Sequence, residues 1–224
     1  MKVSVVVPTF NEAENVGLLV ERLRAVLPGV EVVVVDDGSP DGTAEVASSL
    51  PGVVVIRRPR KLGLGSAVRE GAWRASADIV VVMDADLQHP PEAVPRLVEA
   101  LAKCGADVAV ASRYMGGGRA VWESPVRLAV SRLSALAVRL LIPGVRGVRD
   151  PLSGFFACRR GLLLTSAEPG YKVLLDLLAR RRLRVVEVPY VFEPRRRGAS
   201  KLSVEEAARF TRLILRLIFR GGPP

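Results

Sequence analysis

The sequence predicts an α/β fold in which a mostly parallel central sheet carries helices on both faces. Three observations lead to this prediction. Short valine-rich runs alternate with segments whose apolar residues recur at helical spacing, from residue 3 to about residue 111. The runs are continuously apolar, which is typical of parallel strands that are buried on both faces. The length of 224 residues suits a single domain.

The first half reads as alternating strands and helices. A strand at 3–7 leads, past a helix cap at Asn11, into a helix that ends near residue 26. Further strands are predicted at 32–35, 53–56, 79–83 and 108–111, and further helices at 43–50, 66–75 and 91–103. Because right-handed crossovers join parallel strands, their carboxyl ends should meet at one edge, where such sheets bind ligands.

The second half reads as an elaboration of the same domain, with a helix at 126–141 and a loop at 147–155. We therefore expect one catalytic domain at 1–202 and a C-terminal amphipathic helix within 203–224. The apolar side of that helix either packs on the sheet or lies in the headgroup region of an anionic leaflet. Its basic stripe comprises Arg209, Arg212, Arg216 and Arg220.

The net charge of +10 favours anionic partners: nucleic acid, an anionic bilayer or phosphorylated substrates. Basic residues are grouped, as at 57–61, and a solvated basic surface is the alternative reading. A basic nucleic-acid-binding α/β protein would explain the charge. It would not explain acidic residues after three strands, and an aromatic content of 5% is low for base stacking. We expect no nucleic-acid partner.

Cysteine usage and hydropathy bear on location. Cys104 and Cys158 stand far apart without a paired-thiol motif, so neither a disulfide framework nor a zinc site is indicated. No secretory leader is recognisable, and no apolar run reaches the ~18 to 20 residues that a membrane span needs. We expect a cytoplasmic protein, peripheral to the cytoplasmic face of a membrane.

The strongest chemical signal is the segment DADLQ at 84–88, directly after a buried strand. Asp84 and Asp86 are spaced to bracket one hard divalent cation, with Gln88 as a further oxygen ligand and phosphates completing the shell. In the alternative reading, one aspartate caps the helix near Pro91 and the other is solvated. His89 is the only histidine, which excludes a histidine-based metal centre, and it reads as a loop side chain.

Two more strand ends carry polar groups, PTFNE at 8–12 and DDGSPDGT at 36–43. The second could be only a turn with Thr43 as a helix cap, but the convergence of three such ends predicts a pocket. Carboxylates such as Glu12 and Asp37 suit ribose hydroxyls or base nitrogens. The glycine-rich signatures of dinucleotide and phosphate-loop sites are absent from the sequence.

Together these motifs, with ASRY at 111–114, resemble the inverting family 2 glycosyltransferases of the GT-A (Rossmann-like) fold. The later segments DPLSGFF at 150–156 and GASKL at 198–202 are similar to the polyprenyl-phosphate branch, especially dolichol-phosphate mannose synthases. The resemblance covers nearly the whole chain. The sequence lacks the C-terminal transmembrane hairpins of many members, so self-sufficient anchoring is not expected.

The resemblance implies three groups of site residues. The nucleoside would contact Pro8, Phe10, Glu12, Val35 and Asp37. The donor diphosphate would meet Mg²⁺ or Mn²⁺ in the 84–88 segment, at Asp84, Ala85, Asp86 and Gln88, and a closing segment with Arg195 and Lys201. The acceptor phosphate would be held by Arg113, Arg127 and Ser131, while Asp150 begins a loop that shapes the acceptor site. For Arg127, an exposed arginine on an amphipathic helix is the alternative reading.

The implied reaction moves a hexose, preferably mannose from GDP-mannose, to dolichyl or polyprenyl phosphate with inversion. A lipid monophosphate has a second pKa of about 6 and is already anionic at neutral pH, so no strong base is required. Asp86, Arg113 and Asp150 are the expected catalytic residues. The alternatives are UDP-glucose as donor, or a soluble or glycan acceptor with Asp150 as base. Expected partners are the two substrates, a membrane surface and, as an option, a membrane-embedded protein.

Overall fold

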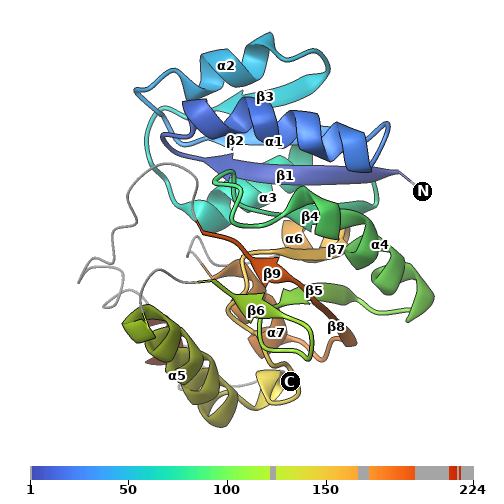
Figure 1. Ribbon diagram of the computed structural model, residues 1–224, viewed down its shortest axis with the longest axis vertical. Helices are drawn as coiled ribbons and strands as arrows, with labels where there is room; N and C mark the ends of the chain where they lie inside the picture. The colour runs from blue at the N-terminus through green and yellow to red at the C-terminus, as the bar shows by residue number, and fades with distance from the viewer. Residues whose placement is uncertain (1, 122–124, 166–171, 195–211, 216, 218–224) are drawn as a thin grey trace.

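The fold is built on a seven-stranded sheet with the order β3-β2-β1-β4-β7-β5-β8 (Figure 1). The computed structural model describes residues 2–121, 125–165, 172–194, 212–215 and 217. The strands of the large sheet are β1 (Val3–Thr9), β2 (Glu31–Asp36), β3 (Val53–Arg57), β4 (Ile79–Val82), β5 (Val108–Ser112), β7 (Phe156–Arg159) and β8 (Val185–Pro189). A second sheet pairs β6 (Arg119–Ala120) with β9 (Val191–Phe192).

All neighbouring strands of the large sheet are parallel except around β7, which runs antiparallel to β4 and to β5. The predicted mostly parallel sheet is therefore confirmed. The antiparallel strand was not predicted, because its four residues, FACR, are too few to show periodicity.

Helices cover both faces of the sheet, as predicted. The helical elements are α1 (Ala13–Val26), α2 (Thr43–Ser49), α3 (Leu64–Arg74), η1 (Pro91–Ala93), α4 (Val94–Lys103), α5 (Pro125–Leu141), η2 (Pro143–Val145), α6 (Arg160–Leu164) and α7 (Val173–Arg180). Alternate β1 residues divide between two apolar cores, with Val5 facing α1, α2 and α4, and Val6 facing α3, α5, α6 and α7. Along the longest axis, α2 and α5 lie at opposite ends (Figure 1).

The described part of the C-terminal segment is helical at residues 212–215 and 217. Leu213 and Leu217 are buried in the core beside α7, whereas Arg212 and Leu215 are exposed. Packing on the domain therefore accounts for part of the apolar side. The remainder of 203–224, with Arg209, Arg216 and Arg220, lies outside the described residues, and the division at 202 stays a prediction. Within the described residues, no helix combines the length and hydropathy of a membrane span.

The starts of α1 and α2 differ from the predicted caps. Asn11 has a positive φ of 62° and lies outside α1, whose first backbone N–H, that of Ala13, donates to Asp41 at 3.1 Å. Thr43 is the first residue of α2 and not its cap, and its hydroxyl accepts from the Glu12 N–H at 2.9 Å. The start of α1 thus uses two acceptors from the first residue of α2 and the loop before it, a long-range arrangement that local spacing does not reveal.

Candidate active site

The loops that follow β1 and β2 are bonded to each other at the carboxyl edge of the sheet. The Asp37 N–H donates to the Thr9 carbonyl at 3.0 Å, and the Thr9 hydroxyl donates to Asp36 at 3.1 Å. Farther along, the Asn11 N–H donates to the Ser39 hydroxyl at 2.9 Å. These bonds bring two of the polar strand ends together, and β4, which is parallel to β1, brings the third to the same edge of the sheet.

Asp37 is fixed by a buried ion pair with Arg58, which follows β3. The other Asp37 oxygen accepts from the Gly63 N–H at 3.2 Å, and Arg58 also donates to the Ser66 hydroxyl at 2.6 Å. Sequence analysis placed Arg58 in a basic surface cluster and missed this role. The only available signal was its position directly after a strand that neighbours β2.

The other residues expected at the nucleoside differ in how they are exposed. Phe10 is exposed, and the Lys61 Nζ lies 4.4 Å from its ring centroid. Glu12 is half-buried and accepts from the Asn15 amide at 2.7 Å, and Pro8 is half-buried. The Val35 side chain is fully buried in the core on the α3 side, so only its backbone can face a ligand. The expected nucleoside contact of Val35 would therefore come from its main chain, and it stays a prediction.

The segment 84–88 forms a tight loop after β4. Asp84 is half-buried, Ala85 and Asp86 are buried, and Asp86 accepts from the Gln88 N–H at 3.1 Å. Gln88 donates its side-chain amide to the Glu193 carbonyl at 3.2 Å. Leu87 adopts a φ of 61°, a conformation that is unusual for a bulky residue, and its side chain is buried. Burial of Leu87 holds this strained turn in place.

The reading of these aspartates as helix caps is wrong, because η1 follows Pro90 and has no side-chain cap. Carboxylate and amide oxygens are the donors that Mg²⁺ and Mn²⁺ prefer, so the residues of this loop fit a hard divalent cation. Among the described residues, no three His, Cys, Asp or Glu side chains gather as a complete metal site. Such a cation would therefore need further oxygens from a ligand, as Mg²⁺ usually does.

His89 lies in the loop after β4, as expected, and its side chain is a buried member of an aromatic cluster. Its ring lies 5.1 Å from that of Phe155 and 5.3 Å from that of Phe192, measured between centroids. Its Nδ1 lies 3.1 Å from the Tyr190 hydroxyl, and its Nε2 lies 3.5 Å from an Asp84 carboxylate oxygen. Burial raises the pKa of Tyr190, so the phenol stays protonated. The cluster gives the acidic loop a rigid support.

Arg113, at the end of β5, makes a two-pronged ion pair with Asp150. The Nε and Nη2 atoms each donate to a carboxylate oxygen at 2.8 Å, and the Arg113 backbone N–H donates at 3.0 Å. Asp150 is fully buried. Burial alone would lower the pKa of Arg113, but the bonds and charge of Asp150 raise it above its ordinary value, so the guanidinium stays charged. The backbone N–H of Asp150 donates to Glu187 at 3.0 Å.

Tyr114 connects this pair to α5. Its hydroxyl lies 2.6 Å from the Ser131 hydroxyl, and the Arg113 guanidinium lies 5.3 Å from its ring centroid. Two of the three residues expected at the acceptor phosphate are thus brought together. The third, Arg127, belongs to α5, but its side chain lies outside the described part of the chain. Arg195 and Lys201 lie outside the described residues.

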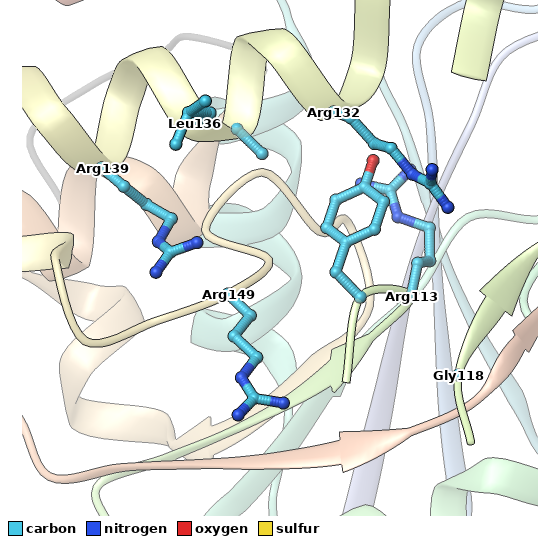
Figure 2. Close-up of a pocket in the computed structure, with 8 residues that line it drawn as sticks. Arg113, Gly118, Arg132, Leu136, Arg139 and Arg149 are labelled. Carbon is cyan, nitrogen blue, oxygen red and sulfur yellow. The ribbon is translucent and has the colours of Figure 1, made fainter. Parts of the chain in front are cut away.

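A cavity of about 320 Å³ opens between α5 and the residues after β5 (Figure 2). Its wall includes Arg113 and three arginines that sequence analysis did not single out. Arg132 and Arg139 stand seven residues apart, which puts them on one side of α5, and this spacing was the signal available. The lining residues are Arg113, Tyr114, Gly118, Arg132, Ala135, Leu136, Arg139 and Arg149.

Comparisons with known proteins give consistent relatives. The family model described as "Glycosyl transferase family 2" matches residues 4–163. The dolichol-phosphate mannosyltransferase of Pyrococcus furiosus is 45% identical over 97% of this chain, which spans 64% of that protein's length. The polyprenol monophosphomannose synthase of Mycolicibacterium smegmatis is 40% identical over 89% of this chain and 80% of its own length.

Solved structures share the fold of this chain. One is glucosyl-3-phosphoglycerate synthase from Mycobacterium tuberculosis in complex with Mn²⁺ and UDP-glucose. It superposes with a TM-score of 0.74 at 30% identity, covering 100% of this chain and 80% of the synthase.

Proposed function

The chain belongs to glycosyl transferase family 2, and from this premise we propose that it transfers a mannosyl group to the phosphate of a polyprenyl lipid. The names of the relatives from P. furiosus and M. smegmatis support this reaction. We propose GDP-mannose as the donor. UDP-glucose is the second candidate, because the M. tuberculosis neighbour was solved with that donor.

One observation carries the proposal: an acidic loop and a permanently charged arginine stand on either side of one aromatic cluster. Asp84 lies 3.5 Å from His89, whose ring lies 5.3 Å from that of Phe192. The Arg113 guanidinium lies 5.5 Å from the centroid of the same Phe192 ring. Transfer between two phosphorylated substrates needs this arrangement, with a cation site for the leaving diphosphate and a fixed positive charge for the incoming phosphate.

For the donor side, we propose that Asp84, Asp86 and Gln88 hold Mg²⁺ or Mn²⁺. When bound there, the cation would neutralise charge on the nucleoside diphosphate as it leaves. The M. tuberculosis synthase was solved with Mn²⁺, which supports a divalent cation here. On the nucleoside side, Asp37, held by Arg58, is proposed to accept hydrogen bonds from ribose or base.

For the acceptor side, Arg113 and Ser131 orient the lipid phosphate, with Arg127 as a further proposed contact. A phosphate oxygen forms the new bond to the anomeric carbon while the bond to the diphosphate oxygen breaks, which inverts the configuration. That oxygen is anionic at neutral pH, so no residue needs to remove a proton. Both Asp150 oxygens accept hydrogen bonds from Arg113, which favours a positioning role over that of a base.

The insoluble acceptor requires contact with a membrane. We propose that the protein works at the cytoplasmic face of a bilayer as a peripheral protein, either alone or beside a membrane-embedded partner. The exposed apolar residues of α5, described below, support such contact.

A donor screen tests the proposal. GDP-mannose, UDP-glucose and UDP-N-acetylglucosamine would each be incubated with polyprenyl phosphate and Mn²⁺, and the products identified by mass spectrometry. We expect mannosyl transfer that EDTA abolishes. Asp86→Ala and the milder Asp84→Asn should both lose transfer while keeping the wild-type circular dichroism spectrum. Full activity of either variant, or transfer to free sugars in place of the lipid, would refute the proposal.

A further inference from the structure

The cavity beneath α5 carries more positive charge than the proposed acceptor site uses. Arg113 is paired with Asp150, but Arg132, Arg139 and Arg149 make no side-chain ion pair within the described part of the chain. The Nε of Arg139 is buried and has no hydrogen-bond partner among the described residues. A buried N–H that lacks an acceptor is costly, so an anion bound against Arg139 would relieve an unfavourable arrangement.

The chemistry of the wall specifies an anion that carries several oxygens. Of the residues that the structure describes, no acidic one lines the cavity, so the three guanidinium groups repel one another until a negative charge enters. Guanidinium groups donate paired N–H bonds that match phosphate oxygens. A volume of about 320 Å³ falls at the small end of cavities that hold small molecules. These properties indicate a phosphate group with a small organic substituent.

The far end of the cavity is distinct from the acceptor site. Figure 2 shows Arg139 and Arg149 on one side of the cavity, from α5 and from the loop below it, with Arg113 and Arg132 on the other side. The seven residues from Arg132 to Arg139 correspond to about 10 Å along the helix axis. A phosphate held by Arg139 and Arg149 is therefore a second group, in addition to one held beside Arg113.

The outer side of α5 indicates where that phosphate comes from. Leu133 and Leu140 are about two-thirds exposed, and Val130 and Leu141 are about half exposed. Leu136 is half exposed and also lines the cavity, so the apolar surface and the arginine pocket adjoin. An apolar helix face flanked by arginines suits the boundary between headgroups and acyl chains, the depth at which phospholipid phosphates lie.

We infer that the cavity binds the phosphate of an anionic phospholipid through Arg139 and Arg149, and thereby docks α5 on an anionic leaflet. Arg132 lies with Arg113 at the acceptor-site end of the cavity and is not part of this phosphate site (Figure 2). The inference requires neither a particular sugar donor nor a polyprenyl acceptor.

Vesicle co-sedimentation tests the inference with phosphatidylcholine vesicles, with and without phosphatidylglycerol. The double variant Arg139→Gln/Arg149→Gln is matched by Arg159→Gln/Arg182→Gln, which removes the same charge from exposed positions. Arg159 is exposed and pairs with Ile79 at the start of β4, so it lies at the end of the sheet opposite to the carboxyl ends of the parallel strands. Each basic residue near an anionic surface contributes about 1 kcal/mol, so binding by the cavity variant should fall on the order of 10-fold or more. The matched variant should stay within about twofold of wild type.

Titration calorimetry with inorganic phosphate separates the two possible sources. Preferential binding to phosphatidylglycerol vesicles that only the cavity variant loses supports the inference. If both double variants lost vesicle binding equally, the binding would come from general charge attraction, and the inference would be overturned. Loss of soluble phosphate binding without loss of vesicle binding would overturn the lipid source. The assays contain neither donor nor acceptor, so a failure of the proposed transfer reaction would not change their outcome. Both variants should retain the wild-type thermal midpoint.

Discussion

Asp150 and Arg113 share two hydrogen bonds of 2.8 Å, so one buried carboxylate sets the direction of a charged guanidinium at the end of β5. Asp150 also accepts from the Arg113 backbone N–H at 3.0 Å, which fixes both the main chain and the side chain of Arg113. The pair joins the loop before β7 to the strand beside it. It therefore contributes to both the stability of the fold and the geometry of the proposed acceptor site.

Removing the carboxylate should separate these two contributions. Asp150→Ala leaves a buried guanidinium unpaired and should lower the free energy of unfolding by about 3 to 5 kcal/mol, measured in urea. Asp150→Asn keeps one hydrogen-bond acceptor and should fold, but with Arg113 misdirected its KM for the lipid acceptor should rise. An exposed carboxylate, Asp78, provides the control Asp78→Asn, which should match wild type in both measurements.

The same variant tests the alternative in which Asp150 is a general base. If Asp150 were a general base, its removal would lower kcat for a hydroxyl acceptor, and kcat would recover as pH rises. If Asp150 positions Arg113, its removal would raise the KM for the phosphorylated acceptor without that pH dependence. A pH-dependent loss of kcat in Asp150→Asn with an unchanged acceptor KM would contradict the positioning role.

Two adjacent arginines should differ sharply in their contribution to stability. Arg58 is buried against Asp37, whereas Arg57 pairs with Glu45 and both members of that pair are more than half exposed. Arg58→Gln strands a buried carboxylate, so it should cost about 3 to 5 kcal/mol in urea unfolding and raise the donor KM. Arg57→Gln should cost no more than about 1 kcal/mol. Similar effects in the two variants would contradict the assigned role of Arg58.

The contrast between these arginines shows what sequence reasoning could reach. The strands, most helices and the acidic loop at 84–88 follow from local spacing, and the structure has them close to the predicted places. Arg57 and Arg58 look equivalent in sequence, because their difference depends on β3 lying next to β2. The burial of His89 could not be predicted for the same reason: the aromatic residues that bury it, Tyr190 and Phe192, are about 100 residues away in sequence.

Two helix glycines provide a matched test of packing. A Cβ at Gly71 would lie 2.4 Å from a Val6 methyl carbon and 3.0 Å from one of Val35, so α3 touches the sheet only because the side chain is absent. Gly71→Ala should therefore cost about 1 to 3 kcal/mol by overpacking. At Gly17 in α1, an added Cβ would meet no described atom within 4 Å, and Gly17→Ala should stabilise by roughly 0.5 to 1 kcal/mol. The measurement is the thermal midpoint of each variant. If Gly71→Ala and Gly17→Ala shifted it in the same direction, this account of the packing would be contradicted.

Asp41 should make stability depend on acid pH, because it bonds to the starts of two helices. It accepts from the Ala13 N–H at 3.1 Å and the Thr43 N–H at 3.0 Å. Burial alone would raise the pKa of Asp41, but the hydrogen bonds from Thr43 and Ala13 outweigh it and hold the pKa below the ordinary value of 3.8. The folded state therefore binds the proton less readily than the unfolded state does. The stabilisation is present above the unfolded pKa and is lost as pH falls through the folded one.

Asp41→Asn removes the charge at every pH, so its effect on the thermal midpoint should depend on pH. Near neutral pH the variant should lose about 0.3 to 1 kcal/mol of stability, because the amide keeps one acceptor oxygen but loses the negative charge at the helix starts. The difference in thermal midpoint between wild type and variant should narrow as pH falls below about 4, where wild-type Asp41 becomes protonated. Glu21→Gln, on the exposed side of α1, serves as the charge-matched control and should show no such narrowing. A constant gap across the acid range would mean that Asp41 acts through its shape alone and not through its charge.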